Sequence, residues 1–414
     1  MDKQLSESIH ACRICDSEAL TEILDLGVQP PANSLRRDLA TALPAIPLVL
    51  CQCDACGTVQ LTETVSPEYL FRDYIWVTGT SGVARAYSEA FRDNMLARCP
   101  TKKLSVLEVA SNDGTFLQRF RERGHIVLGV DPAQNVASMA VDSGIPTLAE
   151  FFGLDVARRI VAGHGHYDAV FARNVIPHVA DVHDVVAGMG HCLADDGTGA
   201  IEFHRADIIL AGLHYDSIYH EHLFYHSLHS IAVLLDRAGL KPFDVTESPI
   251  SGGSYVVYFS RQTRPQTAAY QAEFERERRL EIDKPRPWKE FAKRCESHRT
   301  ALRAKVEESK RQGKRLIGYG ASARSSTMLN FCGIDRHFLD LLADRSPLKH
   351  DRYTPGTDIL IADPKVAFAG RPDTVLLLAW NFQDEILGQI KAEHGWSGEV
   401  IVPLPGEPKT VAVR

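Results

Sequence analysis

The segment from Leu104 to Leu117 joins a short apolar run to a turn that carries carboxylates. Val106 to Val109 is short and rich in β-branched residues, which is typical of a buried strand. The turn from Ser111 to Gly114 consists of residues that bond their own backbone or adopt positive φ. A strand, a tight turn and a helix together direct backbone N–H groups toward a ligand. Because Glu108 and Asp113 would repel a diphosphate, the loop favours a cationic sulfonium and an amino acid's ammonium group.

A second apolar run, Ile126 to Val130, ends in Asp131, about 20 residues after the first. An acidic residue at the end of the second strand can accept hydrogen bonds from both ribose hydroxyls of a nucleoside. The two features together predict S-adenosylmethionine as the cofactor, with a dehydrogenase or an α/β turn without a ligand as alternatives. The residues assigned to cofactor binding are Glu108, Ala110, Asn112, Asp113, Gly114, Asp131 and Asn174.

Four cysteines near the N-terminus form two pairs, Cys12-x2-Cys15 and Cys53-x2-Cys56. Two such pairs place four thiolates on facing turns, which suits tetrahedral zinc with no open ligand position. The 37 residues between the pairs exceed the usual separation of about 15 to 20, which indicates a loop-rich insertion. Cys51 would point the other way on a strand and is predicted to be a spare thiol. We predict structural zinc, with an apolar cluster or an iron–sulfur centre as alternatives.

Titratable side chains are dense between Tyr215 and His222, which predicts that this segment lies outside the core. Tyr219 and His222 are separated by three positions, so on a helix both would face one pocket while His220 points away. A phenol beside a base of near-neutral pKa is the pair needed to enolise a ketone, and Glu221 could orient an imidazole or accept a sugar hydroxyl. Metal ligation and an exposed histidine-rich loop are the alternatives.

Strands and helices alternate from residue 102 onward, which predicts the doubly wound parallel sheet of an α/β protein. The expected strands are 105–109, 126–130, 168–172 and 199–203. This sheet is expected to end near Ser251 to Ser254, ahead of a buried strand from Tyr255 to Ser260. Residues 66–99 are predicted to be mostly helical, apart from Thr78 to Gly82, a cluster able to close over a ligand.

A second α/β unit follows, with a strand near Leu316, the Gly318-x-Gly320 turn and a helix. Arg324 falls in the first turn of that helix and could pair with a phosphate, although a purely structural unit explains the same glycines. The predicted units are a zinc-binding module (1–65), a doubly wound domain with a helical lead-in (66–260), a helical linker (261–312) and a C-terminal Rossmann-like domain (313–414).

The 414 residues suffice for two or three domains, and 44% hydrophobic and 24% charged residues are ordinary for a globular protein. A net charge of -7 argues against a nucleic-acid partner. The chain contains no apolar stretch of about 18 residues and begins with a polar segment, so we expect a cytoplasmic protein without a membrane partner. A monomer or a homodimer is expected.

Taken in order, these motifs resemble the three-domain sugar C-methyltransferases, which methylate nucleotide-linked 4-keto deoxysugars at C3, or in some members at C5. The motifs are the two cysteine pairs, the Ser111-Asn112-Asp113-Gly114 loop, Asn174 and His178, Ile218 to His222, Gly318 to Ala321, and Tyr353 to Gly356. The resemblance implies that His222 is the base, that Tyr219 and Glu221 position the sugar, and that His178 lines the pocket. The residues assigned to substrate binding are Tyr74, Gly320, Arg324 and Tyr353.

The chain departs from the family pattern in three places. Ala110 replaces the usual first glycine of the cofactor loop, Ser251 replaces a histidine, and His204-Arg205 stands where proline is common. The last two lie near the expected position of the sugar, so they bear on which sugar is bound more than on the reaction itself. Two functions remain as alternatives, a methyltransferase that acts on an oxygen or nitrogen of another small molecule, and a non-catalytic binding protein with this fold.

Overall fold

The computed structural model describes residues 5–71, 76–99 and 103–413. Its N-terminal module holds β1 (Ser6–Ser8), β2 (Leu20–Gln29), β3 (Ile46–Cys53), β4 (Val59–Leu61) and β5 (Glu63–Val65). β1 and β5 form a two-stranded ribbon, and β2, β3 and β4 form an antiparallel sheet. The fourth strand of that sheet, β11 (Phe224–Tyr225), comes from the middle of the chain and pairs antiparallel with β4. The N-terminal module is therefore completed by residues that lie far away in the sequence.

A helical segment connects this module to the middle domain. It consists of α1 (Pro67–Phe71), the short helix η1 (Thr78–Thr80) and α2 (Gly82–Leu96). α2 begins after Ser81, whose side chain accepts a hydrogen bond from the backbone N–H of Ala84 and so satisfies one unpaired donor of the first turn. The predicted break between Thr78 and Gly82 is present at the start of α2.

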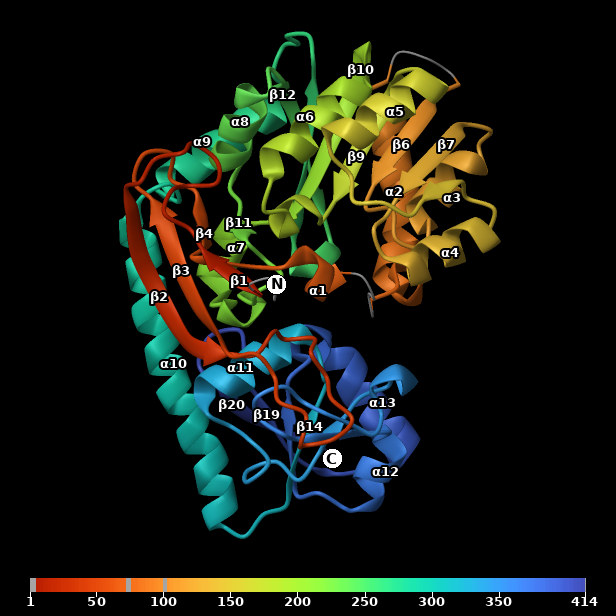
Figure 1. Ribbon diagram of the computed structural model, residues 1–414. Coiled ribbons are helices and arrows are strands. Elements are labelled where there is room, and N and C mark those ends of the chain that lie inside the picture. Colours follow the sequence, from red (N-terminus) through yellow and green to blue (C-terminus); the bar gives the residue numbers. More distant parts are fainter. Residues whose placement is uncertain (1–4, 72–75, 100–102, 414) are drawn as a thin grey trace.

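The middle domain is built on a seven-stranded sheet with helices on both faces (Figure 1). Its strand order is β12-β13-β10-β9-β6-β7-β8, and the strands from β8 to β10 are parallel. The strands are β6 (Ser105–Val109), β7 (Ile126–Val130), β8 (Thr147–Leu148), β9 (Tyr167–Arg173), β10 (Leu193–His204), β12 (Lys241–Ser248) and β13 (Ser254–Ser260). The helices are α3 (Thr115–Arg121), α4 (Gln134–Asp142), α5 (Leu154–His164), α6 (Val182–Cys192), α7 (Ala206–Gly212) and α8 (Leu228–Arg237), with short helices η2 (Ile176–His178), η3 (Tyr215–Ser217) and η4 (Ile250–Gly252).

Five adjacent parallel strands with helices on both faces confirm the predicted doubly wound sheet (Figure 1). The prediction that the sheet ends before Tyr255 was wrong. β13 pairs antiparallel with both β10 and β12 and therefore lies inside the sheet. All seven of its residues are buried, because both faces of the strand are covered. Because both faces are buried, the sequence lacks the alternation of apolar and polar residues that marks a strand with one face in solvent.

Two helices, α9 (Ala268–Arg279) and α10 (Pro285–Arg311), lead to the C-terminal domain. α10 runs along β2 of the N-terminal module and reaches the C-terminal domain beside α11 (Ala323–Cys332) (Figure 1). Pro285 occupies its first turn. The N–H groups of that turn have no acceptor within the helix, so the missing N–H of proline costs no hydrogen bond. The buried side chains of α10 include Trp288, Phe291 and Leu302, which recur on one face.

The C-terminal domain has a second seven-stranded sheet, in the order β16-β17-β15-β14-β18-β19-β20. Its central strands are parallel, and the two edge strands are antiparallel to their neighbours. The elements are β14 (Leu316–Tyr319), β15 (Leu342–Ala343), η5 (Pro347–Lys349), β16 (Arg352–Tyr353), β17 (Leu360–Ala362), α12 (Pro364–Ala369), β18 (Thr374–Leu377), η6 (Trp380–Phe382), α13 (Gln383–His394), β19 (Gly398–Val402) and β20 (Lys409–Val413). The predicted Rossmann-like sheet is therefore present.

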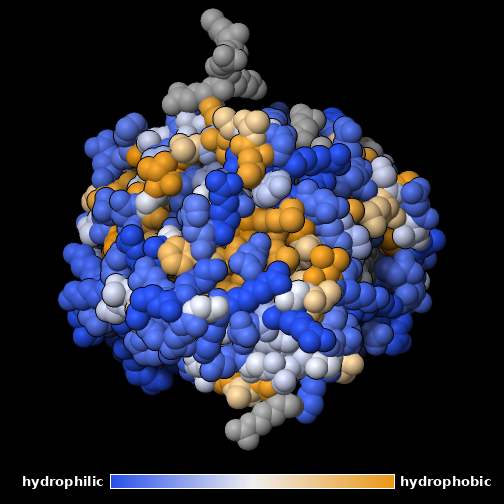
Figure 2. Space-filling model, turned by 90° about the horizontal axis from the view of Figure 1, so that it is seen from below, coloured by the Kyte–Doolittle hydropathy of each residue, from blue (hydrophilic) through white to orange (hydrophobic). Residues whose placement is uncertain are grey.

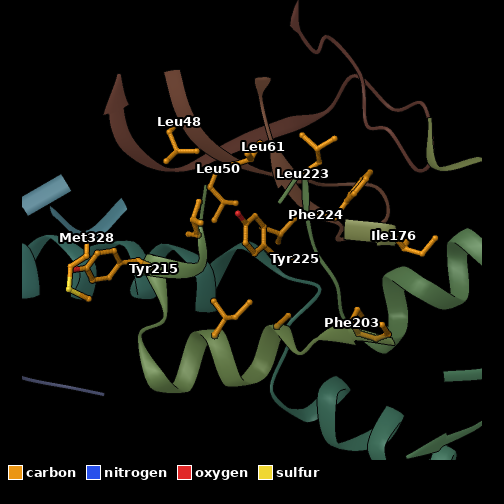
Figure 3. Close-up of a cluster of buried hydrophobic side chains, with 14 of the residues drawn as sticks. Leu48, Leu50, Leu61, Ile176, Phe203, Tyr215, Leu223, Phe224, Tyr225 and Met328 are labelled. Atoms are coloured by element: carbon orange, nitrogen blue, oxygen red, sulfur yellow. The ribbon is translucent and has the colours of Figure 1, made fainter. Parts of the chain in front are cut away.

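One large cluster of buried apolar side chains extends through all three parts of the molecule. Where they meet, Leu48, Leu50 and Leu61 of the N-terminal module pack near Leu223 and Phe224 (Figure 3). The surface seen from the side of the C-terminal domain is mostly hydrophilic, with an apolar area near its middle (Figure 2). Within the described ranges, every helix is too short or too polar to cross a membrane.

Candidate functional site

The four cysteines of the two predicted pairs converge at one point. Their sulfur atoms all lie within 4.8 Å of one another, with 3.6 Å between Cys12 and Cys56 and 3.5 Å between Cys15 and Cys53. Tetrahedral zinc with Zn–S bonds of about 2.3 Å places its sulfurs about 3.8 Å apart, so the set fits that ion. Cys51 is buried but lies outside the cluster, and burial raises the pKa of its thiol to about 12. Among the residues described, this is the one group of metal-ligating side chains.

The loop after β6 has an unusual backbone. Ala110, Asn112 and Gly114 have φ of 54°, 50° and 77°, in the left-handed region. Ala110 therefore adopts a conformation that costs a Cβ-bearing residue energy, where the family usually has glycine. Asn112 is held on three sides: its backbone N–H donates to Asp131 Oδ2 (2.8 Å), its Oδ1 accepts from Thr78 N–H (2.8 Å), and its Nδ2 donates to the Trp76 carbonyl (3.1 Å).

Glu108 lies at the end of β6 beneath this loop and is 2% exposed. Within the described chain its buried Oε2 has no hydrogen-bond partner. Burial raises the pKa of this carboxyl well above its usual value, and the nearby Arg173 guanidinium opposes that shift. An unpartnered buried carboxyl oxygen fits a cationic ligand group, such as the ammonium or sulfonium of S-adenosylmethionine.

The other two acidic residues of the site bind backbone groups. Asp131 accepts from the N–H groups of Asn112 and of Ala133 (2.9 Å), which fixes the end of β7 against the loop. Asp113 accepts from Thr115 Oγ1 (2.7 Å) and from the backbone N–H of Gly79 (2.8 Å). The segment around η1 thus closes onto the loop through Asp113. Each carboxylate oxygen has a second lone pair, so neither bond prevents Asp131 from also accepting a ribose hydroxyl.

The predicted base and phenol meet, although the segment that carries them is not the helix expected from their spacing. It is a turn, in which the His222 N–H donates to the Tyr219 carbonyl (2.8 Å). The Tyr219 hydroxyl lies 2.8 Å from His222 Nε2, and His222 Nδ1 lies 2.9 Å from the Ser217 carbonyl oxygen. A carbonyl only accepts, so Nδ1 carries the proton and Nε2 presents its lone pair. Burial, followed by the neighbouring His178, lowers the pKa of His222 well below its usual value, so the ring is neutral but the near-neutral pKa expected from the sequence was wrong.

His178, at the end of η2, faces this pair. Its ring centroid is 4.7 Å from that of His222, with the two rings nearly perpendicular. Burial lowers the pKa of His178 to about 4, so it too is neutral near pH 7. Asn174, four residues earlier, has φ of 51° and donates its N–H to the Glu202 carbonyl (2.8 Å). The strand end of β9 therefore supplies His178 and Asn174 to one edge of the sheet, as expected.

The histidine-rich run is buried, and the prediction that it lies outside the core was wrong. His220 and Glu221 are each 2% exposed, and His220 Nε2 lies 3.2 Å from both the Ile46 and the Pro47 carbonyl oxygens. The polar groups are tolerated there because they find partners within the protein. Glu221 Oε1 accepts from Nδ2 of Asn33 (2.6 Å), and burial raises the pKa of Glu221 to about 7 while this bond lowers it. Sequence reasoning missed Asn33, since no local signal links residues so far apart.

Arg324, predicted to face a phosphate, forms a two-pronged ion pair with a buried acid. Its Nε and Nη2 lie 3.0 Å and 2.8 Å from the two carboxylate oxygens of Asp216, which is fully buried. The Trp380 indole N–H donates to the same carboxylate (2.8 Å). His204 and His214 stack beside this group, and buried ring nitrogens of both lack partners in the described structure. Asp216, Trp380, His204 and His214 were not among the predicted site residues.

The remaining predicted substrate contacts are placed as follows. Tyr353 exchanges backbone hydrogen bonds with Arg36, a residue of the loop between β2 and β3. Gly320 has φ of 100°, and a Cβ there would lie 2.7 Å from the Cβ of Ala379, so close packing alone requires glycine. Tyr74 lies outside the described residues.

Three family models match consecutive parts of the chain. They are described as "Putative zinc binding domain" (residues 12–71), "Methyltransferase domain" (82–245) and "C-methyltransferase C-terminal domain" (249–405). The chain is 33% identical to the C-methyltransferase NovU of Streptomyces niveus, over 98% of both chains.

Solved structures resemble a smaller part of the chain. One is the magnesium protoporphyrin IX methyltransferase ChlM from Synechocystis PCC 6803 with bound S-adenosylmethionine, at 12% identity and a TM-score of 0.34, covering 43% of this chain and 79% of that one. Another is the PH0226 protein from Pyrococcus horikoshii OT3, at 16% identity and a TM-score of 0.37, covering 48% of this chain and 97% of that one.

Proposed function

The chain belongs to the family of three-domain C-methyltransferases that use S-adenosylmethionine, and we propose that its acceptor is a nucleotide-linked 4-keto deoxysugar methylated at C3. The relative that supports this assignment is named for carbon methylation, without its acceptor. The choice of a ketone rests on the site itself. A carbon atom becomes a nucleophile at neutral pH only when a neighbouring group acidifies its proton and a base removes it.

The observation that carries the proposal is the Tyr219–His222 pair. His222 is neutral, and its Nδ1–H donates to Ser217, so Nε2 has a lone pair available at pH 7. Tyr219 donates to that lone pair in the structure, so its hydroxyl turns to a substrate oxygen before Nε2 takes a proton from carbon. A general base next to a hydrogen-bond donor is the arrangement that forms and stabilises an enolate.

We assign the following roles to the side chains. His222 Nε2 takes the proton from the carbon next to the ketone, which leaves an electron pair shared with the carbonyl oxygen. Glu221 and Tyr219 orient the sugar by hydrogen bonds, and His178 lines the opposite side of the pocket. S-adenosylmethionine supplies an electrophilic methyl group, and Glu108 with the loop after β6 would hold it. The enolate carbon would take that methyl group as its bond to the sulfonium sulfur breaks, which leaves S-adenosylhomocysteine. Burial of the turn keeps bulk water away from the enolate, so a proton returns to the carbon only through His222.

Arg324 and the start of α11 support a phosphate-bearing acceptor. α11 begins after Ser322 with a capping box, and Arg324 lies in its first turn. The partners of Arg324 leave its side chain 19% exposed, so its outer face can meet an anion while Asp216 holds its orientation. The burial of the Asp216 carboxylate is tolerated because it accepts hydrogen bonds from both the Arg324 guanidinium and the Trp380 indole N–H.

The experiment that tests this function is proton exchange without methyl transfer. The protein is incubated in D₂O with S-adenosylhomocysteine and a panel of thymidine- and uridine-diphosphate 4-keto-6-deoxysugars, and the sugar protons are followed by NMR. We expect exchange at C3 that His222→Asn abolishes. Exchange at C5 instead would show that C3 is the wrong carbon and would move the proposed methylation to C5. In a parallel incubation with S-adenosylmethionine, methylation of a hydroxyl or amine by a protein that shows no carbon-bound exchange would overturn the proposal in favour of O- or N-methyl transfer.

A further inference from the structure

We propose that Asn33, in the loop between β2 and β3 of the zinc-binding module, is a positioning residue that holds the Glu221 carboxylate toward the sugar. This inference rests on the function proposed above, because it takes Glu221 to be a sugar contact. It extends that function by giving the zinc-binding module a direct part in the active site.

The contact between the two residues is short and joins distant segments. Asn33 Nδ2 donates to Glu221 Oε1 at 2.6 Å, across 188 positions of the chain. Glu221 is 2% exposed, whereas Asn33 is exposed, so the amide reaches inward from the surface to a buried carboxyl. A buried carboxylate without a donor is strongly disfavoured, and an amide donor favours its charged form. Asn33 therefore influences both where the carboxyl lies and whether it is ionised.

The loop that carries Asn33 is held directly after this residue. Ser34 Oγ lies 3.0 Å from the Tyr69 hydroxyl. Two residues further on, Arg36 exchanges backbone hydrogen bonds with Tyr353 (2.8 and 3.3 Å) and forms an ion pair with Asp358. The loop is thereby attached to the C-terminal domain. Both attachments lie within three positions of Asn33, and the Ser34 N–H donates to the Pro31 carbonyl (3.0 Å) across it, so a fixed backbone presents Asn33 to Glu221.

The segment around Glu221 is attached to the same module from its other side. His220 donates to backbone carbonyls at the start of β3, and the Leu223 carbonyl accepts from the Leu61 N–H (2.9 Å). Phe224 and Tyr225 then pair with β4 as a strand. Figure 3 shows their side chains among those of the N-terminal strands. The backbone on each side of Glu221 is therefore fixed by the zinc-binding module, and Asn33 adds the contact to the carboxyl itself.

The experiment is a double-mutant cycle on methyl transfer to the keto sugar that the wild-type protein accepts. Asn33→Leu keeps the size of the side chain but removes the donor, and Arg37→Ala, at an exposed position of the same loop, is the control. We expect Asn33→Leu to lower kcat/KM by about 10- to 100-fold, Arg37→Ala to change it less than about 3-fold, and S-adenosylhomocysteine affinity to stay unchanged. Because Asn33 acts through Glu221, the double variant with Glu221→Ala, which removes the acceptor, should be no slower than Glu221→Ala alone. Full additivity, or wild-type kcat/KM in Asn33→Leu, would overturn the inference.

A second measurement does not depend on turnover. The carboxyl band of Glu221 is titrated by difference infrared spectroscopy, with Glu221→Gln to identify it. The neighbouring titratable groups, His178, Tyr219, His220 and His222, are identical in wild type and Asn33→Leu, so a difference between the two isolates the amide. We expect the midpoint to rise in Asn33→Leu; an unchanged midpoint would overturn the role of Asn33. If the midpoint rises but no keto sugar is accepted by the wild type, the proposed function fails while the Asn33–Glu221 contact stands.

Discussion

The hydroxyl of Tyr219 and the Nε2 of His222 lie 2.8 Å apart on one turn, and the opposite nitrogen of that ring lies 2.9 Å from the Ser217 carbonyl. The backbone therefore selects the tautomer, and the phenol marks the nitrogen that is able to accept a proton. This arrangement needs no residue from another domain to define the base. The other domains instead determine where the turn lies and which substrate reaches it.

Removal of the imidazole should stop the reaction without disturbing the cofactor. We expect His222→Ala to lower kcat by about 10² to 10⁴ and to leave S-adenosylhomocysteine affinity unchanged, since the assigned cofactor residues lie in other segments. His164→Ala, at an exposed end of α5, is the control. Calorimetric titration and steady-state kinetics give the two quantities. Wild-type turnover in His222→Ala would remove this residue from the base role.

The pH dependence of kcat/KM should reflect Glu221. Burial raises the pKa of its carboxyl to about 7, while the pKa of His222 is far below that of free histidine. If the carboxylate is the form that binds sugar hydroxyls, activity rises as the pH rises through about 7 and falls below it. His222 stays unprotonated across the same range. We therefore expect an acidic limb near pH 7 in the wild type that disappears from the profile of Glu221→Gln; an unchanged limb in that variant would assign it to another group.

Loss of zinc should affect both the N-terminal module and the reaction. In Cys12→Ser with Cys56→Ser, two of the four sulfurs are removed, and the module loses the ion that closes its turns. Since β11 belongs to this sheet, the turn that carries Tyr219 loses its support. We expect no bound zinc by elemental analysis, a lower melting temperature and loss of methyl transfer. Cys51→Ala, outside the cluster, should retain one zinc per chain; equal zinc content in both variants would contradict the site.

Acid should destabilise the protein through its buried histidines. His226 is fully buried, and burial lowers its pKa from 6.5 to about 3. The unfolded chain thus binds a proton below pH 6.5 that the folded chain binds only near pH 3, so the stabilisation is complete above 6.5 and is lost as the pH falls. One such group removes about 3 kcal/mol between pH 6.5 and 4. Chemical denaturation at several pH values should show this fall, and His226→Phe should make it shallower; parallel curves would exclude His226 as a contributor.

Local patterns were sufficient for the elements that build the sheet and the zinc cluster. The strands from Ser105 to Val109 and from Ile126 to Val130 are bounded as predicted, because turn-forming or polar residues follow both. The cysteine pairs converge because each lies on one tight turn. These features depend on residues that are neighbours in the sequence.

Contacts between distant segments were beyond such patterns. A separation of three positions fits both a helix and a tight turn, so the spacing of Tyr219 and His222 predicted their meeting but not its backbone. The burial of Glu221 depends on a loop 188 positions earlier, and the pairing of Arg324 with Asp216 joins two domains. The density of titratable residues in the sequence suggested a solvated segment, whereas the structure supplies hydrogen-bond partners for these polar groups from elsewhere.

The pairing of β11 with β4 has a consequence for synthesis of the chain. β4 ends at Leu61, and its partner strand is translated about 160 residues later, which takes on the order of 10 to 30 s on a ribosome. During that interval the backbone donors and acceptors along β4 form an open sheet edge, available to the same strand of another nascent chain. The N-terminal sheet is therefore completed only after all five parallel strands of the middle domain have been translated.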